Sequence, residues 1–390
     1  MPVVASRSSS LLLLVVLASA CPHASETPAA GGSAAATPVA GGSAPEPETK
    51  PAKLLPLADV EPSSLDSDET VAFLPTFATR QGGSWRVPVD AWAYEPEEDD
   101  LGRLATLKVL AEALEVVPGS PESDAIAHNL RPFVVDNERN QWVAVRRGPH
   151  AARVGPTSAD GRARSILEIP ADDPATAGEG TPPWIELEVV LPRGDDRRFA
   201  AWAQLLPDDG VSLVSDIDDT IKITNVLDRR EMLANTFLRA YQAVPGMADA
   251  YRRFAAQGVA IHYVSASPLP LLGALQELAA REGFPRGSLA LRPFRWVDGT
   301  AIELLEPSET YKTEAIAAIV ESFERRAFVL VGDTGERDPE IYAAIARRFP
   351  DRVRSIWLRD PVPGGTPGVR ARLDAAYEGL PRTLWHVIVD

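Results

Sequence analysis

Short apolar runs with alternating polar positions recur along residues 58–208. Gly, Pro, Asn and Asp separate the runs, which read TVAFLPTF, WRVPVDAWAY, RPFVVD, QWVAVRR, RSILEIP, WIELEVVLP and RRFAAWAQLLP. An apolar residue at every second position is typical of a β-strand that buries one face. We therefore expect residues 58–208 to form a β-rich, sandwich-like domain of antiparallel strands.

One stretch inside this region has a helical period instead. Residues 101–116 place Leu104, Leu107, Ala111 and Leu114 on one face of a helix, so we expect a helix inserted in the sheet. The tryptophans of the region are better explained as core or interface aromatics than as a ligand site; they are Trp85, Trp92, Trp142, Trp184 and Trp202.

Strands and amphipathic helices alternate in residues 209–390. The apolar runs VSLVS, VAIHYVSA, SLALRPF, AFVLVGD and RVRSIWL are separated by the helical stretches ADAYRRFAAQG, PLLGALQELAAREG, KTEAIAAIVESFERR and DPEIYAAIARRFP. This alternation predicts an α/β domain in which a parallel sheet carries helices on both faces. Ligands of such sheets bind at the carboxyl ends of the strands, so polar residues there are the candidates for a functional site.

The first residues of the chain predict export. Residues 1–21 contain Arg7, the apolar run LLLLVVLASA and then Cys21, a pattern typical of a signal peptide and too short to span a bilayer comfortably. The end of this segment resembles a bacterial lipoprotein processing site, although Ala18 stands where Leu is more usual. We expect a lipid on Cys21 that anchors the protein in the cell envelope, on the periplasmic or outer side. The alternative is an ordinary secretory signal and a secreted protein.

The next segment predicts a flexible connection. Residues 22–57 consist mainly of Ala, Pro, Gly, Ser and Thr and hold almost no large apolar side chains. Such a segment buries too little surface to fold, so we expect a disordered tether with a reach of roughly 30–35 Å.

The charge balance limits the partners. The 390 residues carry 39 Lys and Arg against 55 Asp and Glu, a formal net charge of −16, and no run of basic residues offsets it. Nucleic acids are bound through clustered cations, so we expect no nucleic-acid partner. With one cysteine in the sequence, no intrachain disulfide is possible.

Acidic residues crowd the end of the first strand of the α/β region. In VSDIDDTIKIT, Asp216, Asp218 and Asp219 fall within four residues. Packed carboxylates repel one another and need a cation, a bound proton or full solvation. Ser265 and Asp333 follow later strands, and all these ends meet at one edge of the sheet.

A hard cation would relieve this repulsion. Mg²⁺ prefers oxygen ligands, and its charge would allow several carboxylates to share one place. We predict Mg²⁺ at Asp216 and Asp333, with a backbone carbonyl of the loop, and we include Asp218 in the metal set.

Phosphoryl transfer is the chemistry that uses such a group. One carboxylate attacks phosphorus, and a second protonates the leaving oxygen and later activates water. We assign these roles to Asp216 and Asp218. Lys, Ser and the metal would stabilise the charge on the phosphoryl oxygens, and the residues that we expect to bind phosphate are Thr220, Ser265 and Lys312.

These motifs resemble a known family. DIDDT matches the DxDxT signature of the haloacid dehalogenase (HAD) superfamily of phosphohydrolases, and Ser265, Lys312 and Asp333 fall where its later motifs belong. SDIDDTIKITNVLDRREMLANTF, YVSASP, YKTEAI and VGDTGERDPEIY resemble the catalytic domain of the actin-patch-protein type of phosphatidate phosphatase, a branch related to lipins. The resemblance covers about residues 211–360. It implies a HAD-like Rossmannoid fold, Mg²⁺ dependence and hydrolysis of phosphatidate to diacylglycerol.

Several residues have alternative explanations. A calcium loop that begins at Asp216 would need Gly and Glu where Ile221 and Leu227 stand, which argues against that reading. Asp338 precedes a proline at a helix start, so a role near the metal and an N-cap role are both open. His262 lies in an apolar strand and is expected to be a core residue whose polar groups are satisfied.

The substrate is less constrained than the chemistry. The intervals 221–264 and 268–310 leave no room for a large lid, which favours a substrate presented by a bilayer or a macromolecule. Residues 225–247 could form an apolar lip beside the site or a packed helix. Three rival functions remain: a phosphatase of another exported phosphomonoester, a phosphatidate-binding module without activity, and a surface adhesion role for the β-rich half.

Overall fold

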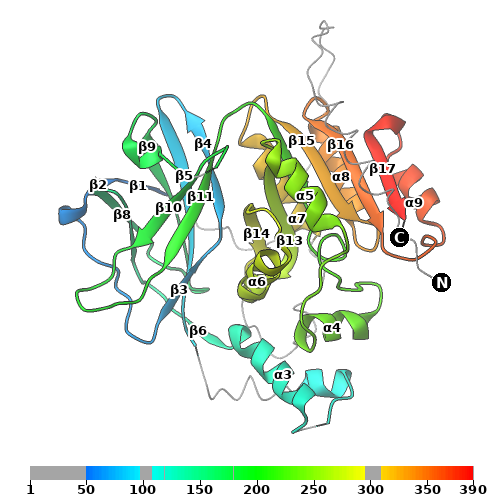
Figure 1. The fold of residues 1–390 in the computed structure, drawn as a ribbon, viewed down its shortest axis with the longest axis horizontal. Helices are drawn as coiled ribbons and strands as arrows, with labels where there is room; N and C mark the ends of the chain where they lie inside the picture. The colour runs from blue at the N-terminus through cyan, green and yellow to red at the C-terminus, as the bar shows by residue number, and fades with distance from the viewer. Residues whose placement is uncertain (1–49, 97–107, 118, 179, 295–308, 390) are drawn as a thin grey trace, which may run out of the picture.

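The computed structural model describes residues 50–96, 108–117, 119–178, 180–294 and 309–389. Two sheets lie side by side (Figure 1). The first has eleven strands, which are β1 (Lys50–Ala52), β2 (Leu55–Pro56), β3 (Thr70–Phe73), β4 (Thr76–Gln81), β5 (Ser84–Pro96), β6 (Val135–Asn137), β7 (Val143–Arg147), β8 (His150–Val154), β9 (Arg162–Pro170), β10 (Trp184–Val189) and β11 (Ala200–Leu206).

The first sheet is mixed and curled. Its strand order is β1-β9-β5-β4-β11-β10-β7-β8-β2, and β3 and β6 pair with β5. Most neighbours are antiparallel, as predicted, but β1 pairs with β9 and β11 pairs with β4 in parallel. The period-two pattern predicts strands correctly here because it reports one buried face. It carries no information on which strands become neighbours.

Two boundaries in this half differ from the sequence-based prediction. Residues 50–57, assigned above to the tether, contain β1 and β2, which pair with β9 and β8. Cys21 and most of the expected tether lie outside the described residues. The predicted helix at 101–116 is described from residue 108 and is helical over residues 108–113. A second helix, α3 (Pro121–Leu130), follows it.

The second sheet is the predicted parallel sheet. Its order is β14-β13-β12-β15-β16-β17, and each neighbouring pair is parallel. The strands are β12 (Val211–Ser215), β13 (Ala260–Pro268), β14 (Ser288–Arg292), β15 (Ala327–Asp333), β16 (Val353–Asp360) and β17 (Trp385–Val389). The helices are α4 (Arg229–Phe237), α5 (Met247–Ala256), α6 (Leu272–Glu282), α7 (Glu309–Glu321), α8 (Asp338–Arg348) and α9 (Val369–Ala376).

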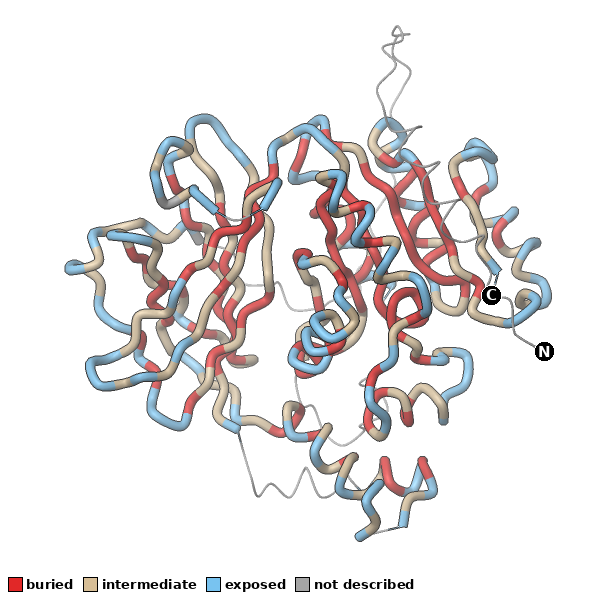
Figure 2. Tube along the Cα trace, in the orientation of Figure 1, coloured by how far each residue is buried: buried red, intermediate tan, exposed pale blue. Residues whose placement is uncertain are grey.

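Alternate residues of the central strands separate the two helical layers. Leu213 and Val329 belong to the apolar cluster of α5 and α6, whereas Val214 and Leu330 belong to the cluster of α7 and α8. Successive side chains of a strand point to opposite faces, so a strand between two helical layers is apolar throughout. Figure 2 shows buried residues concentrated along these strands. The predicted α/β architecture is confirmed.

The β-rich domain covers the edge strand β14. The Leu289 amide donates a hydrogen bond to the Pro75 carbonyl at 2.9 Å. Phe77 lies edge-on to His262, with ring centroids 4.9 Å apart, and stacks on Phe323 at 5.5 Å. An uncovered edge strand would offer unpaired backbone groups to other chains. The first domain therefore protects the second sheet.

His262 is the satisfied core residue that the sequence predicts. Its ring nitrogens hydrogen-bond to the hydroxyls of Ser212 at 2.9 Å and Ser288 at 2.7 Å. Burial, with a smaller effect of the Arg326 charge, lowers the pKa of His262 to about 3. The imidazole therefore stays uncharged at neutral pH, and both nitrogens are satisfied.

Arg326 secures the connection between the two domains. The side chain is 1% exposed and donates to the Ser212 hydroxyl at 2.7 Å. It also donates to three backbone carbonyls of the connecting segment, at Pro207, Asp209 and Val211. A buried guanidinium is stable only when its donors are satisfied, and these four contacts satisfy it.

No helix within the described ranges has the length and apolar character to cross a membrane.

Replacing this buried guanidinium should destabilise the protein. We expect Arg326→Met to lower the free energy of unfolding by about 2–4 kcal/mol, because it removes the donor from the buried Ser212 hydroxyl and from three part-buried carbonyls. Arg325→Met is the matched control: its side chain is 70% exposed and pairs with Asp208, so the loss should stay below about 1 kcal/mol. Urea unfolding of both variants measures the difference, and equal losses would contradict this role of Arg326.

Candidate active site

The site lies where the order of the parallel sheet reverses direction. β12 and β15 are neighbours in the sheet but not in sequence, and such a switch point leaves a crevice at the carboxyl ends of the strands. Asp216 directly follows β12, Asp333 ends β15, and Asp338 begins α8. The Asp216 amide donates to the Val331 carbonyl at 2.8 Å, which fixes the end of β12 against β15.

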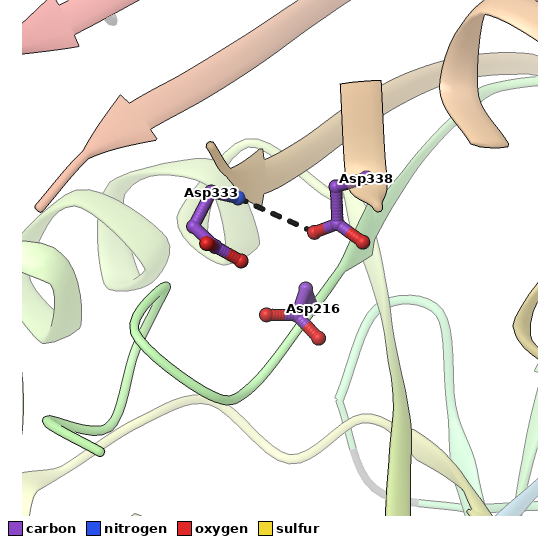
Figure 3. Close-up of side chains that lie close together, drawn as sticks. All are labelled: Asp216, Asp333 and Asp338. Carbon is purple, nitrogen blue, oxygen red and sulfur yellow. Dashed lines mark hydrogen bonds between the residues drawn. The ribbon is translucent and has the colours of Figure 1, made fainter. Parts of the chain in front are cut away.

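Three buried carboxylates meet there. Asp216, Asp333 and Asp338 each offer an oxygen within 4.8 Å of the others, and they are 1%, 0% and 0% exposed. Figure 3 shows them around one small space, with the Asp333 amide donating to Asp338 at 3.3 Å. A Cβ on Gly332 would collide with Asp338 Oδ2, so glycine is needed for this close approach.

One lysine partly neutralises the group. Lys312, on α7, places Nζ 2.6 Å from Asp216 Oδ1 and 3.7 Å from Glu336 Oε2, and it also pairs with Asp338. The ammonium is 2% exposed. Burial alone would lower the pKa of Lys312, but Asp216 and the other carboxylates outweigh it and raise that pKa well above its usual value. Lys312 therefore remains charged.

The single positive charge of Lys312 does not balance the negative charges of the carboxylates around it. Burial raises the pKa of Asp216 well above its usual range; Lys312 opposes the rise, and the neighbouring carboxylates add to it. Burial and the neighbouring Asp338 likewise raise the pKa of Asp333. Burial also raises the pKa of Glu336, to about 7. Four acids share one lysine, so the cluster has room for another positive charge.

The donor set fits a hard cation. Asp216 Oδ2 and Asp333 Oδ2 are buried and have no hydrogen-bond partner among the described residues, although a buried polar atom without a partner is costly. All available ligands are oxygens, which is the chemistry that Mg²⁺ and Ca²⁺ prefer. The described cluster could hold a metal ion at Asp216, Asp333 and Asp338.

Asp218 points away from this cluster into a second one. Its Oδ1 accepts hydrogen bonds from Lys222 Nζ at 3.0 Å and from the Thr224 hydroxyl at 2.8 Å. Its Oδ2 accepts from the hydroxyls of Ser265 at 3.0 Å and Ser267 at 2.8 Å. Each oxygen thus accepts two hydrogen bonds, and the carboxylate lies next to the end of β13.

These contacts keep Asp218 ionised. Burial by itself would raise the pKa of Asp218, but the charge of Lys222 and the donated hydrogen bonds of Thr224, Ser267 and Lys222 outweigh it and hold the pKa below its usual range. Lys222 is 1% exposed, and its Nζ lies 4.6 Å from the Tyr241 ring centroid. The tyrosine face thus makes a cation–π contact with the lysine.

Asp219 shapes the loop instead of taking part in either cluster. Its carboxylate accepts from three successive amides, those of Thr224 and Asn225 at 2.8 Å and of Val226 at 2.7 Å. Its own φ is 53°, a left-handed conformation that Asp tolerates better than most residues. This closed turn holds the loop that carries Asp218.

A small hollow with polar and apolar walls adjoins Asp218. Val226 and Met232 line it together with Asp218, Ser267 and Glu336. On the other side of α4, Leu233 and Phe237 are buried in the core. Residues 225–247 thus combine the two expectations. One face of α4 packs in the core, and Val226 and Met232 border the hollow beside Asp218.

The structure groups the predicted residues differently from the sequence. Asp338, not the Asp218 carboxylate, lies with Asp216 and Asp333. The reason is that Lys222, Thr224 and the serines engage Asp218 on the far side of the loop. Asp338 does not cap α8: Arg337 occupies the N-cap position and makes no side-chain cap bond. Thr220 is buried, and its hydroxyl has no hydrogen-bond partner in the described part of the chain.

Four further polar residues of the site are not predicted from the sequence. They are Lys222, Thr224, Ser267 and Glu336. Lys222 had a signal in the sequence: a lysine between Ile221 and Ile223 in a buried segment needs a counter-charge, and Asp218 precedes it by four residues. Ser267 had none, because serines that follow strands are common.

Comparisons with known proteins agree with the motifs. Residues 211–360 match the family described as "Phosphatidate phosphatase APP1, catalytic domain". The chain is 35% identical over 154 residues to phosphatidate phosphatase APP1 of Saccharomyces cerevisiae, which covers 38% of this chain and 26% of the relative. It is 31% identical over 183 residues to an uncharacterized protein of Schizosaccharomyces pombe, covering 45% and 30% respectively. The chain thus spans less than a third of either relative.

A solved structure, the class C acid phosphatase of Bacillus anthracis with tungstate bound, is similar at a TM-score of 0.22 and 17% identity. The likeness covers 32% of this chain and 52% of that one. Because the two structures superpose so poorly, we base the fold assignment on the parallel six-stranded sheet of this protein. The predicted resemblance of residues 211–360 to the APP1 catalytic domain is confirmed.

Mg²⁺ should stabilise the protein through the carboxylate cluster. At a free concentration of 100 times its Kd, we expect a gain in the free energy of unfolding of about 2.7 kcal/mol. Asp333→Asn removes one ligand charge and should reduce the gain at the same concentration to about 1 kcal/mol or less. Thermal unfolding with and without Mg²⁺ measures both.

Asp360→Asn is the matched control. Asp360 is also buried at a strand end, but its carboxylate accepts from the amides of Val362 and Thr366 outside the cluster. This variant should keep the whole Mg²⁺ response whatever its own stability. Equal responses of the two variants would contradict a metal site at Asp333.

Proposed function

We propose that the protein is a Mg²⁺-dependent phosphatidate phosphatase that releases phosphate and diacylglycerol. The observation that carries the proposal is the buried Asp216, with Oδ1 held by Lys312 and Oδ2 without a partner. A free carboxylate oxygen beside a fixed cation is what a nucleophile for a phosphoryl group requires. The match of residues 211–360 to the APP1 catalytic domain supports the choice of reaction.

The phosphoryl group would bind between the two clusters. Lys312 supplies a buried positive charge, and Ser265 and Thr220 supply hydroxyls; that of Thr220 has no partner. Donors fixed in a buried site stabilise charge on the phosphoryl oxygens more than they would in water. These residues thus orient phosphorus toward Asp216.

In the first step, a carboxylate oxygen of Asp216 forms a bond to phosphorus. The bond between phosphorus and the ester oxygen breaks, and that oxygen leaves with its electron pair. Asp218 donates a proton to it, so that diacylglycerol departs as an alcohol. The Asp218 of the structure is ionised, and the approach of an anionic phosphate raises the pKa of a nearby carboxyl group, which allows Asp218 to hold the proton.

In the second step, Asp218 acts as the base. It accepts a proton from water, whose oxygen forms a bond to phosphorus while the bond between phosphorus and Asp216 breaks. Phosphate leaves, and Asp216 is again a free carboxylate. The contacts of Lys222 and Thr224 favour the ionised Asp218, which is the form that ends the first step.

Asp216, Asp333 and Asp338 would hold the Mg²⁺ ion. When bound, Mg²⁺ supplies positive charge that offsets the carboxylates and polarises the phosphoryl group. Lys312 alone cannot balance the four acids around it.

A lipid substrate is favoured by the surroundings of Asp218. The hollow beside it is bordered by Val226 and Met232, and Leu227 next to them is 57% exposed. Apolar side chains at the rim suit an ester whose alcohol part is apolar. The yeast relative is a phosphatidate phosphatase, which supports the same substrate for this protein.

We propose further that the protein is exported and tethered by a lipid on Cys21. The support is the sequence of residues 1–21, with its short apolar run before a single cysteine. Cys21 lies outside the described residues. A tether from Cys21 to Lys50 would keep the site near a membrane that contains the substrate.

Phosphate release tests the function. The full-length protein with Mg²⁺ should hydrolyse phosphatidate in mixed micelles much faster than a soluble phosphomonoester. Asp218→Asn should lower kcat by roughly 10²–10⁴-fold, the contribution of a general acid and base. Turnover of the soluble ester alone would replace the lipid by another phosphomonoester. Absence of any turnover, with phosphatidate still bound, would favour a binding module.

Detergent partitioning tests the anchor. The protein expressed with its own leader should enter the detergent phase of a phase-separating detergent and lose this property in Cys21→Ser, because the thiol that carries the lipid is gone. Mass spectrometry of the mature N-terminus should find lipid on Cys21. A mature chain that is cleaved elsewhere and remains in the aqueous phase would contradict the anchor.

A further inference from the structure

An apolar cavity of about 390 Å³ lies at the seam between the two domains. α6 and the following loop form one wall, and Pro75 and Trp202 of the β-rich domain form another. Ligand pockets occur preferentially at domain interfaces and hold about 300–1,000 Å³. The volume here is at the lower end of that range, which suits a single alkyl chain.

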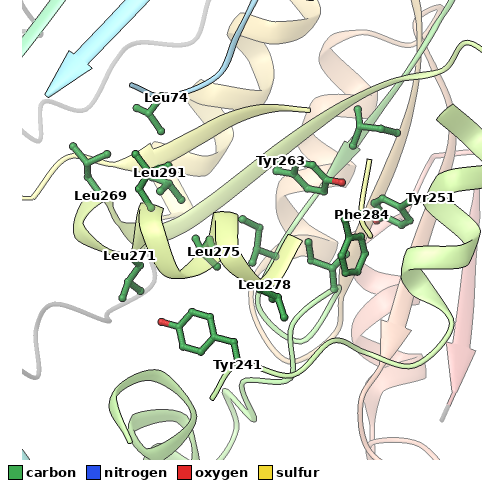
Figure 4. Packing of buried hydrophobic residues seen from close by; sticks show 14 of the residues in the cluster. Leu74, Tyr241, Tyr251, Tyr263, Leu269, Leu271, Leu275, Leu278, Phe284 and Leu291 are labelled. Atoms are coloured by element: carbon green, nitrogen blue, oxygen red, sulfur yellow. The ribbon is translucent and has the colours of Figure 1, made fainter. Parts of the chain in front are cut away.

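The cavity has an apolar floor and a polar mouth. The floor consists of buried side chains, which are Ile217, Ile221, Tyr263, Leu275, Leu278 and Phe284. Figure 4 shows Leu275 and Leu278 on α6, with Phe284 and Tyr263 nearby. Arg286 and Gln276 line the cavity too, but they are exposed. Tyr263 directs its hydroxyl to the Pro285 carbonyl at 2.9 Å, so it adds no free polar group.

Arg286 is held at the mouth of the cavity by two aromatic rings. Its guanidinium carbon lies 4.1 Å from the Trp202 ring centroid and 5.5 Å from that of Trp184. Within the described part of the chain, no carboxylate oxygen lies within 4.0 Å of it. Stacking on the two rings leaves the N–H groups available for an anion.

We propose that this cavity binds a single-chain amphiphile with an anionic head, such as a fatty acid. The alkyl chain fills the apolar floor, and the head group pairs with Arg286 at the mouth. Interiors are close-packed, so a void of this size forfeits contacts that an apolar ligand would restore. A carboxylate matches the planar fork of an arginine.

The site is separate from the carboxylate cluster. Ile217 and Ile221 contact the cavity, and the loop that contains them carries Asp216 and Asp218 on its other side. None of the residues around the cavity belongs to either cluster. The inference does not rest on phosphatase activity, and its test measures binding alone.

Calorimetric titration of the delipidated full-length protein tests the proposal with laurate, below its micelle-forming concentration. We expect one saturable site per chain. Affinity should rise roughly fourfold for each methylene from octanoate to laurate, as each is buried in the cavity. Dodecanol, which has the same chain without the charge, should bind about tenfold more weakly than laurate. Absence of saturable laurate binding would overturn the proposal.

Three variants locate the site. Arg286→Gln should weaken laurate binding about tenfold, whereas Arg382→Gln should not change it. Arg382 is the matched control because it stacks on Trp385, the first residue of β17, at 4.0 Å and is not among the residues that line the cavity. Ala279→Trp should abolish binding by filling the cavity from α6.

The variants also separate loss of the site from loss of the fold. Thermal unfolding checks that Ala279→Trp is folded. If it is not, the comparison of Arg286→Gln with Arg382→Gln still decides the question. Equal affinity of the wild type and Arg286→Gln, or of the wild type and a folded Ala279→Trp, would overturn the proposal.

Discussion

The burial of several carboxylates around one lysine is the constraint on which the site depends. Asp216, Asp333 and Asp338 are almost wholly inaccessible, and Lys312 contacts two of them directly. Such an arrangement is costly unless further positive charge arrives. The fold tolerates it because strand ends and helix α8 fix each carboxylate through the backbone. A divalent cation and a phosphoryl group would then enter a site that needs little rearrangement.

The sheet determines which residues can meet. The reversal of strand order between β12 and β15 brings residues 216 and 333 together although more than a hundred positions separate them. Successive side chains of the same strands point to opposite faces, so the helices pack in two layers. Lys312 comes from α7 and Asp338 from α8, which pack on the same face. The β-rich domain covers the edge strand β14 and forms one wall of the apolar cavity. The two domains are therefore one structural unit.

The strand-end residues could be predicted from the sequence because parallel strands all end at one edge. This rule brings Asp216, Ser265 and Asp333 together without knowledge of the loops. It fails for Asp218, whose direction depends on the turn that Asp219 closes and on the buried Lys222. It fails also for the parallel pairs in the first sheet, since a period of two reports burial and not neighbours. The cavity arises from the contact of two domains and has no local signal.

The most direct test of the central claim is to find the phosphoryl group on Asp216. The protein would be mixed with Mg²⁺ and phosphatidate labelled in its phosphate, quenched in acid within the first turnover, and digested for peptide mapping. The account predicts label on the peptide that contains Asp216, and no label in Asp216→Asn. Release of phosphate without any labelled peptide, or label on another residue, would contradict it.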